Sequence, residues 1–188
     1  MINRAGLLFF VVISGCTKAP GSSVTGDSAA HAGMSTDRHE AMHGADTASL
    51  SDSAFEKLQQ RGGRVMGVDQ YTSSHKFDIT PDGGRIELQR NTTDSMDIAE
   101  IRSHMRDIEK AFRSGDFAKP FAVHDREMPG TRVMTNRRSA IQYVYHELPR
   151  GAELRLVTTD SAVRAAIADF IRAQRAEHRS TGQDVPRH

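Results

Sequence analysis

The chain has 188 residues, of which 37% are hydrophobic and 26% are charged, enough for one globular domain of ordinary size and a tail. Its 25 basic and 24 acidic residues leave a formal net charge of +1. This balance argues against a dedicated nucleic-acid binder, which would carry a clear excess of Lys and Arg, so we expect no nucleic-acid partner.

The N-terminus has the pattern of an export signal. Arg4 supplies a positive start, and the apolar run from Ala5 to Ile13 that follows is too short to span a bilayer as a mature helix. The run ends in Ile13-Ser14-Gly15-Cys16, and Cys16 is the only cysteine of the chain. This ending resembles the lipobox of bacterial lipoproteins, in which an aliphatic residue and two small residues precede a cysteine.

That resemblance implies that residues 1–15 are a signal peptide and that Cys16 is lipidated and becomes the mature N-terminus. We therefore expect the N-terminal lipid to hold the protein at a membrane of the bacterial cell envelope, facing the periplasm or the exterior. The alternative is an ordinary signal peptide with a chance cysteine. In either case a lone cysteine excludes an internal disulfide and, once lipidated, excludes cysteine catalysis.

Residues 16–54 are rich in Ala, Gly, Ser, Thr and Asp, which predicts a disordered tether because such a segment cannot bury enough apolar surface to fold. Two His-x-x-Met patterns lie inside it and suggest a metal site made of His31, Met34, His39, Met42 and His43. Imidazole and thioether together favour soft ions such as Cu(I) and Ag(I). The segment resembles the His/Met-rich stretches of periplasmic copper- and silver-sequestering proteins. The alternative is a polar linker with incidental His and Met.

A short helix is expected from Ser51 or Asp52 to Arg61, where Gly62-Gly63 would end it, followed by an edge strand over 64–68. The globular part, residues 55–180, contains an internal repeat of a four-residue motif. Thr92-Thr93-Asp94-Ser95 recurs as Thr158-Thr159-Asp160-Ser161, 66 residues later.

Each copy of this tetrapeptide follows a strand–turn–strand pattern and precedes an amphipathic helix. In the first copy, strands over 74–80 and 85–90 flank the turn 81–84, with Ile79 expected opposite Ile86. Asp94 and Asp160 are the expected N-caps of the two helices.

The second hairpin covers 139–148 and 152–158, and its apolar residues on both faces suggest a central place in the sheet. Residues 131–136 between the copies suggest a further strand, and 181–188 a frayed end. The fold class that follows is α+β: two layers, with an antiparallel sheet and the two repeat helices on one of its faces.

No phosphate-binding loop, His-Glu-x-x-His, Cys-x-x-Cys or Gly-x-Ser-x-Gly pattern occurs. The pattern places His75 and His146 on apolar strand faces, His178 on an apolar helix face and His104 at the margin of an apolar helix stripe. We expect three of them to converge where sheet and helix ends meet: His75, His104 and His178. Met66 or Met134 would then add a thioether to a copper-type site. The alternative reading of each histidine is a hydrogen-bonded residue of the core or its rim.

The leading hypothesis is a lipid-anchored, extracytoplasmic accessory protein that binds soft metal ions, copper above all, for buffering or delivery. The first alternative is a metal-free interaction module with a protein partner in the cell envelope. The second is a small enzyme with His104 or His124 as general base, which requires a concave pocket and a carboxylate beside one of these rings.

Overall fold

The computed structural model describes residues 50–68 and 71–184. The predictions for the signal peptide, for Cys16 and for the tether ligands lie outside these residues; the ligands concerned are His31, Met34, His39, Met42 and His43. The elements in chain order are α1 (Asp52–Met66), β1 (Ser73–Thr80), β2 (Gly83–Arg90), α2 (Ser95–Ser114), α3 (Ala118–His124), α4 (Thr131–Asn136), the short 3₁₀ turn η1 (Arg138–Ala140), β3 (Gln142–Leu148), β4 (Gly151–Val157) and α5 (Ser161–Glu177).

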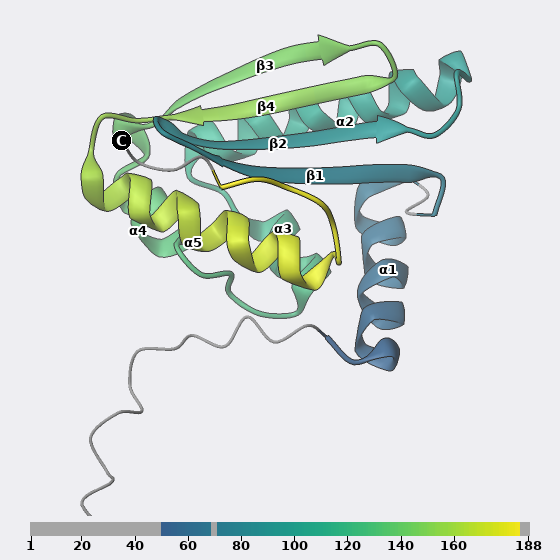
Figure 1. Ribbon diagram of the computed structural model, residues 1–188, viewed down its shortest axis with the longest axis horizontal. Coiled ribbons are helices and arrows are strands. Elements are labelled where there is room, and N and C mark those ends of the chain that lie inside the picture. Colours follow the sequence, from purple (N-terminus) through teal and green to yellow (C-terminus); the bar gives the residue numbers. More distant parts are fainter. Residues whose placement is uncertain (1–49, 69–70, 185–188) are drawn as a thin grey trace, which may run out of the picture. The chain divides into compact units, whose positions relative to one another are not determined.

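The strands form one antiparallel sheet in the order β1-β2-β4-β3, which makes one layer of the domain (Figure 1). Its inner face carries aliphatic and aromatic side chains, whereas residues such as Arg85 and Glu153 lie on the outer face. Both α2 and α5 pack against the inner face and share one hydrophobic core with it. The predicted α+β class with two helices on one face of an antiparallel sheet is therefore confirmed.

The internal repeat is visible in the two central strands. Burial follows the same pattern along β2 and β4 at matching positions, 68 residues apart. Ile86 of β2 lies directly opposite Leu154 of β4, its counterpart in the repeat, and both are buried. A pseudo-twofold axis therefore passes between these two residues and relates one strand–strand–helix unit to the other.

The two repeat helices exchange places over the sheet. Helix α2, which follows the first hairpin, lies mainly over β3 and β4 of the second. Helix α5, which follows the second hairpin, lies over β1 and β2 of the first. The close approach of α5 depends on Gly84, since a Cβ there would lie 2.8 Å from a side-chain carbon of Ile167. Each hairpin is thus covered by the helix of the other unit.

Local sequence determines the helix ends. The carboxylate of Asp94 accepts hydrogen bonds from the backbone N–H groups of Met96 and Asp97, and Asp160 does the same at the start of α5. Gly115 ends α2 with a φ of 83°, a conformation that favours glycine. The two predicted N-caps, Asp94 and Asp160, are confirmed.

The predicted register of the first hairpin is wrong by two residues. Thr80 lies opposite Gly83, so the turn contains only Pro81 and Asp82, and Phe77 pairs with Ile86. Gly83 belongs to the strand because β4 passes so close that a Cβ would lie 1.9 Å from the Leu156 carbonyl oxygen. A shift of two positions leaves every side chain on its expected face.

Other local predictions are also wrong. Helix α1 continues through Gly62-Gly63 to Met66 and stops at Gly67, which has a φ of 67°, so no strand forms over 64–68. Residues 131–136 form helix α4, whose start at Gly130 is pressed against the Ala166 carbonyl of α5. The incoming strand β3 lies at the sheet edge, because the return strands of the two hairpins pair at the centre.

The end of the described chain is also ordered where fraying was expected. Residues 181–184 run parallel to the free edge of β1, with the N–H of Phe77 bonded to the Thr181 carbonyl at 3.0 Å. The N–H of Ile79 donates to the Gln183 carbonyl at 2.9 Å. This segment covers one edge of the sheet.

Candidate functional site

A cavity of about 60 Å³ lies between the first hairpin, α2, α3 and α5. Its wall is mostly aliphatic and aromatic, but it also contains Lys119, two methionines, Met66 and Met105, and four histidines: His75, His104, His124 and His178. The volume suffices for a few water molecules or a small ion with part of its ligand shell. The convergence expected of His75, His104 and His178 is found in this cavity.

Each of these histidines reaches the cavity for a local reason. His75 alternates with Lys76 along β1 and therefore shares the inner face of the sheet with Phe77. His104 lies on the buried stripe of α2, beside Met105. His178 is the C-cap residue of α5. Met134, considered as a thioether donor, is fully buried in the core and does not line the cavity.

Three of the rings are direct neighbours. The ring centroids of His75 and His178 are 5.0 Å apart with an interplanar angle of 28°. His124 lies edge-on to His178 at 5.1 Å. The ring centroid of Phe77 lies 5.8 Å from that of His75 and 5.7 Å from that of His178. The phenyl ring of Phe77 therefore packs against the His75–His178 pair.

The ring of His124 is fixed by hydrogen bonds at both nitrogens. Its Nδ1 lies 2.7 Å from Glu177 Oε2, and its Nε2 lies 3.0 Å from Gln174 Oε1. Glu177 is buried and is also paired with Arg126. Burial raises the pKa of Glu177, but the hydrogen bonds from His124 and Arg126 outweigh this effect and lower its pKa below the ordinary value. His124 has no nitrogen left for a ligand or a substrate.

The other three rings are different. Within residues 50–68 and 71–184, the ring nitrogens of His75, His104 and His178 make no hydrogen bond. His104 is 8% exposed, and the other two are partly buried. These nitrogens are not fully buried, so they remain accessible to water or to a ligand in the cavity.

These rings also remain neutral at physiological pH. Burial lowers the pKa of His75 to about 4, and the nearby rings of His104 and His124 add to the effect. Burial, followed by the positive charge of Lys119, lowers the pKa of His104 to about 4. Burial also lowers the pKa of His178 well below its usual value. A neutral imidazole offers a lone pair, which is the form that binds a metal ion.

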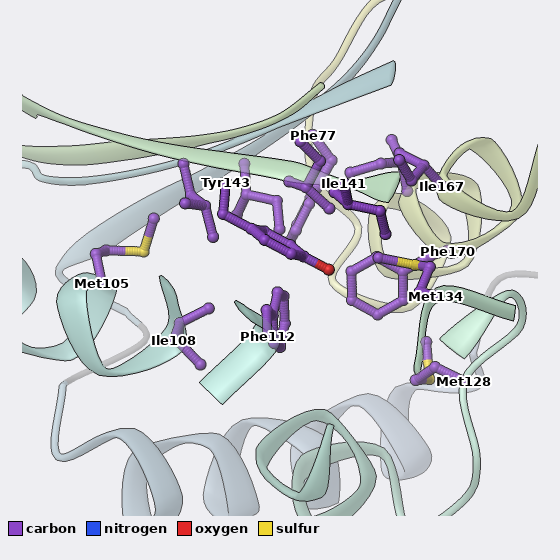
Figure 2. Packing of buried hydrophobic residues seen from close by; sticks show 14 of the residues in the cluster. Phe77, Met105, Ile108, Phe112, Met128, Met134, Ile141, Tyr143, Ile167 and Phe170 are labelled. Carbon is purple, nitrogen blue, oxygen red and sulfur yellow. The ribbon is translucent and has the colours of Figure 1, made fainter. Parts of the chain in front are cut away.

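The pseudo-twofold axis gives these histidines an internal comparison. Their counterparts in the other unit, 68 residues on in the strand and 66 in the helices, are Tyr143 for His75, Phe170 for His104 and Phe112 for His178. These three counterparts also meet, with Phe112 centred 6.2 Å from Tyr143 and 5.9 Å from Phe170 (Figure 2). One half of the domain therefore has an apolar aromatic cluster where the other has three histidines.

The cavity is not a preformed site of the zinc type. Among the described residues, no group of three or more His, Cys, Asp or Glu side chains is arranged to hold a metal ion. The stacked rings of His75 and His178 would have to turn about their side-chain bonds before their nitrogens reached one ion. The sulfur donors available at the cavity are those of Met66 and Met105.

No protein-family model, curated protein or solved structure matches this chain. In the part of the chain that the structure covers, no helix is long and apolar enough to cross a membrane. Function must therefore be argued from the cavity and its residues.

Sequence reasoning missed two features of the site. It did not place His124 beside Glu177, because these residues meet only through the packing of α3 on α5. It also missed Met105 as a possible donor, since its place on the α2 stripe indicates ordinary core packing. The signal for the first was Gln174, a polar residue on the apolar stripe of α5 where its counterpart in α2 is Ile108.

Proposed function

We propose that this protein is a lipid-anchored accessory protein of the bacterial cell envelope that binds soft metal ions, copper foremost, for buffering or delivery. The His/Met tether and the cavity of the domain are its two binding sites. The observation that carries the proposal is the set of three imidazoles, without hydrogen-bond partners among the described residues, around a cavity that two thioethers also line.

The comparison between the two halves supports a role beyond packing. A buried imidazole is a poorer core residue than a phenyl ring, because its polar nitrogens lose their hydration and need a partner. The other half fills the same three positions with Tyr143, Phe170 and Phe112, so the fold itself accepts aromatic rings other than imidazole there. Histidine at all three positions is best explained if the nitrogens bind something.

The arrangement gives less support to a histidine-based enzyme. The required carboxylate is present, but Glu177 and Gln174 occupy both nitrogens of His124. His104 lines the cavity, and no carboxylate in the part of the chain that the structure describes is hydrogen-bonded to its ring. A general base needs a free nitrogen within reach of the substrate proton, together with a group that orients it. Neither ring meets both conditions.

The domain site can be tested by replacing its three histidines with the residues that occupy the corresponding positions of the other repeat unit. The full chain carrying His75→Tyr, His104→Phe and His178→Phe should keep the fold and lose the share of Cu(I) binding that belongs to the domain. Anaerobic competition with a Cu(I) chelator measures the stoichiometry, and circular dichroism verifies the fold. His146→Ala is the matched control, because His146 is exposed on β3 and outside the cavity.

The tether is tested separately in the full chain by replacing His31, His39 and His43 with Ala and Met34 and Met42 with Leu. We expect this variant to lose the remaining copper. If the wild-type chain binds no Cu(I), metal binding is refuted and the metal-free interaction module becomes the better hypothesis. If the cavity variant binds as much as wild type, the domain has no part in it.

The lipid anchor needs its own experiment. Cys16→Ser should abolish incorporation of a labelled fatty acid and release the chain from the membrane fraction, whereas the wild type should retain both. A labelled Cys16→Ser protein, or a wild type that takes up no label, would contradict the anchoring.

A further inference from the structure

We propose that the histidine cavity selects a monovalent soft ion, Cu(I) or its analogue Ag(I), and rejects Zn(II) and Cu(II). This inference rests on the proposed function, and it specifies the ion class from the charge and the donor atoms of the cavity. We assign as its ligands the imidazoles of His75 and His178 and the thioether of Met66; His104 and Met105, both on α2, line the same cavity.

The first argument is charge. None of the described residues that line the cavity is an Asp or a Glu. Glu177 is close in sequence to His178, but His124 and Arg126 already occupy its carboxylate. A divalent ion would therefore bring two uncompensated charges into a largely buried site. Its desolvation cost is roughly four times that of a monovalent ion, because the Born energy rises with the square of the charge.

Lys119 in the cavity wall also disfavours a divalent ion. Lys119 lines the cavity, and its Nζ lies 3.8 Å from Asp107 Oδ2. Asp107 is 65% exposed, so water screens most of its charge. At His104 the positive charge of Lys119 therefore outweighs the negative charge of Asp107, which penalises each added positive charge on an ion near this ring.

The second argument is the kind of donor. Thioethers and imidazoles are neutral, and sulfur ligands favour Cu(I). Zinc requires four N, O or S donors in a tetrahedron and usually includes thiolate or carboxylate. Within residues 50–68 and 71–184 no cluster of three such N, O or thiolate donors exists. Two imidazoles and a thioether are a sufficient set for a low-coordinate monovalent ion and not for zinc.

The third argument is which rings can move. His124 is held at both nitrogens and stays in place. His75 and His178 make no hydrogen bonds to the described residues, and their centroids are 5.0 Å apart. A turn of either ring disturbs only stacking, so this pair can close around an ion. His124 then contributes to the position of the His178 ring and does not act as a ligand.

The experiment is NMR of the histidine rings in the full chain, titrated with Ag(I), Zn(II) and Cu(II). We expect Ag(I) to shift the ring signals of His75 and His178 at one equivalent beyond those taken by the tether. Zn(II) should leave these signals in place, and Cu(II) should not broaden them. Met66→Leu should weaken Ag(I) binding at these rings by at least about tenfold, the lower end of what loss of even an outer ligand partner costs.

Met96→Leu is the control for the methionine variant, because Met96 is 75% exposed and outside the cavity. Leu and Met have similar volumes, so both variants should fold. If Zn(II) or Cu(II) reaches these rings as readily as Ag(I), the selectivity is refuted while metal binding stands. If no ion affects the rings, both the inference and the domain part of the proposed function are refuted.

Discussion

Acid should destabilise this domain well before its carboxylates are protonated. The perturbation is a decrease in pH from 7 to 5 in the presence of a chelator, so that no metal is bound. His75 and His104 have pKa values of about 4 in the folded protein, against 6.5 for an ordinary histidine. The unfolded chain therefore takes up protons in this range and the folded domain does not.

The linkage of protons to folding gives the magnitude. One pKa unit corresponds to about 1.4 kcal/mol, so each of the two histidines should lower the free energy of unfolding by about 2 kcal/mol at pH 5. The two together remove about 4 kcal/mol, a large share of the 5–15 kcal/mol that is typical of a domain. The lowered pKa of His178 acts in the same direction. The stability is complete above pH 6.5 and falls as the pH decreases towards 4.

The assay is urea unfolding followed by far-ultraviolet circular dichroism at half-unit steps between pH 7.5 and 5. The range stays above the ordinary pKa values of Asp and Glu, which separates the histidines from the carboxylates. His104→Phe should remove about 2 kcal/mol of the loss, because Phe cannot be protonated, whereas the exposed control His146→Ala should keep the whole loss. An unfolding free energy that is equal at pH 7 and pH 5 would refute the reasoning, and so would equal slopes for wild type and His104→Phe.

Three further predictions concern single side chains, each measured by chemical denaturation. Tyr143→Phe should be neutral or should stabilise the domain by up to about 1 kcal/mol, because the buried hydroxyl has no hydrogen-bond partner among the described residues; a clear loss of stability would reveal a hidden partner. Gly130→Ala should cost about 3 kcal/mol, since φ is 81° and the new Cβ would lie 2.0 Å from the Ala166 carbonyl oxygen; a neutral result would show that α4 can shift away from α5. Glu177→Gln should cost about 2 kcal/mol because it replaces a buried charged partner of His124, and the ring signals of His124 should move with it; unchanged ring signals would contradict the pairing.

The sequence predicts the elements whose causes are local. Asp94 and Asp160 cap their helices through atoms two and three residues away, so a short pattern suffices to find them. The edge position of β3 could not be found in this way, because it depends on which strands pair across the pseudo-twofold axis. The turn at Pro81 was misjudged for the same reason, since the fit of Gly83 against Leu156 involves a distant strand.

The residues of the candidate site also differ in whether local sequence or tertiary packing determines their positions. The apolar patterns place His75 and His178 on buried faces and His104 at the margin of one, and all three line the cavity. The same kind of pattern also places His146 on an apolar strand face, and there it is wrong, because β3 lies at the sheet edge and His146 is exposed. The correspondence of His75 with Tyr143 is hard to find in the sequence because the repeat offset is 68 residues in the strands and 66 in the helices. The pairing of His124 with Glu177 arises from tertiary packing alone.

The exchange of helices between the two hairpins has a consequence for biosynthesis. A nascent chain that ends before Ser161 has made the first hairpin but not α5, the element that shields it from solvent. We therefore expect neither half to be stable by itself and the domain to close only once α5 has been synthesised. Two fragments divided in the connection between α2 and β3 should therefore be unstructured alone and should regain the native fold when mixed.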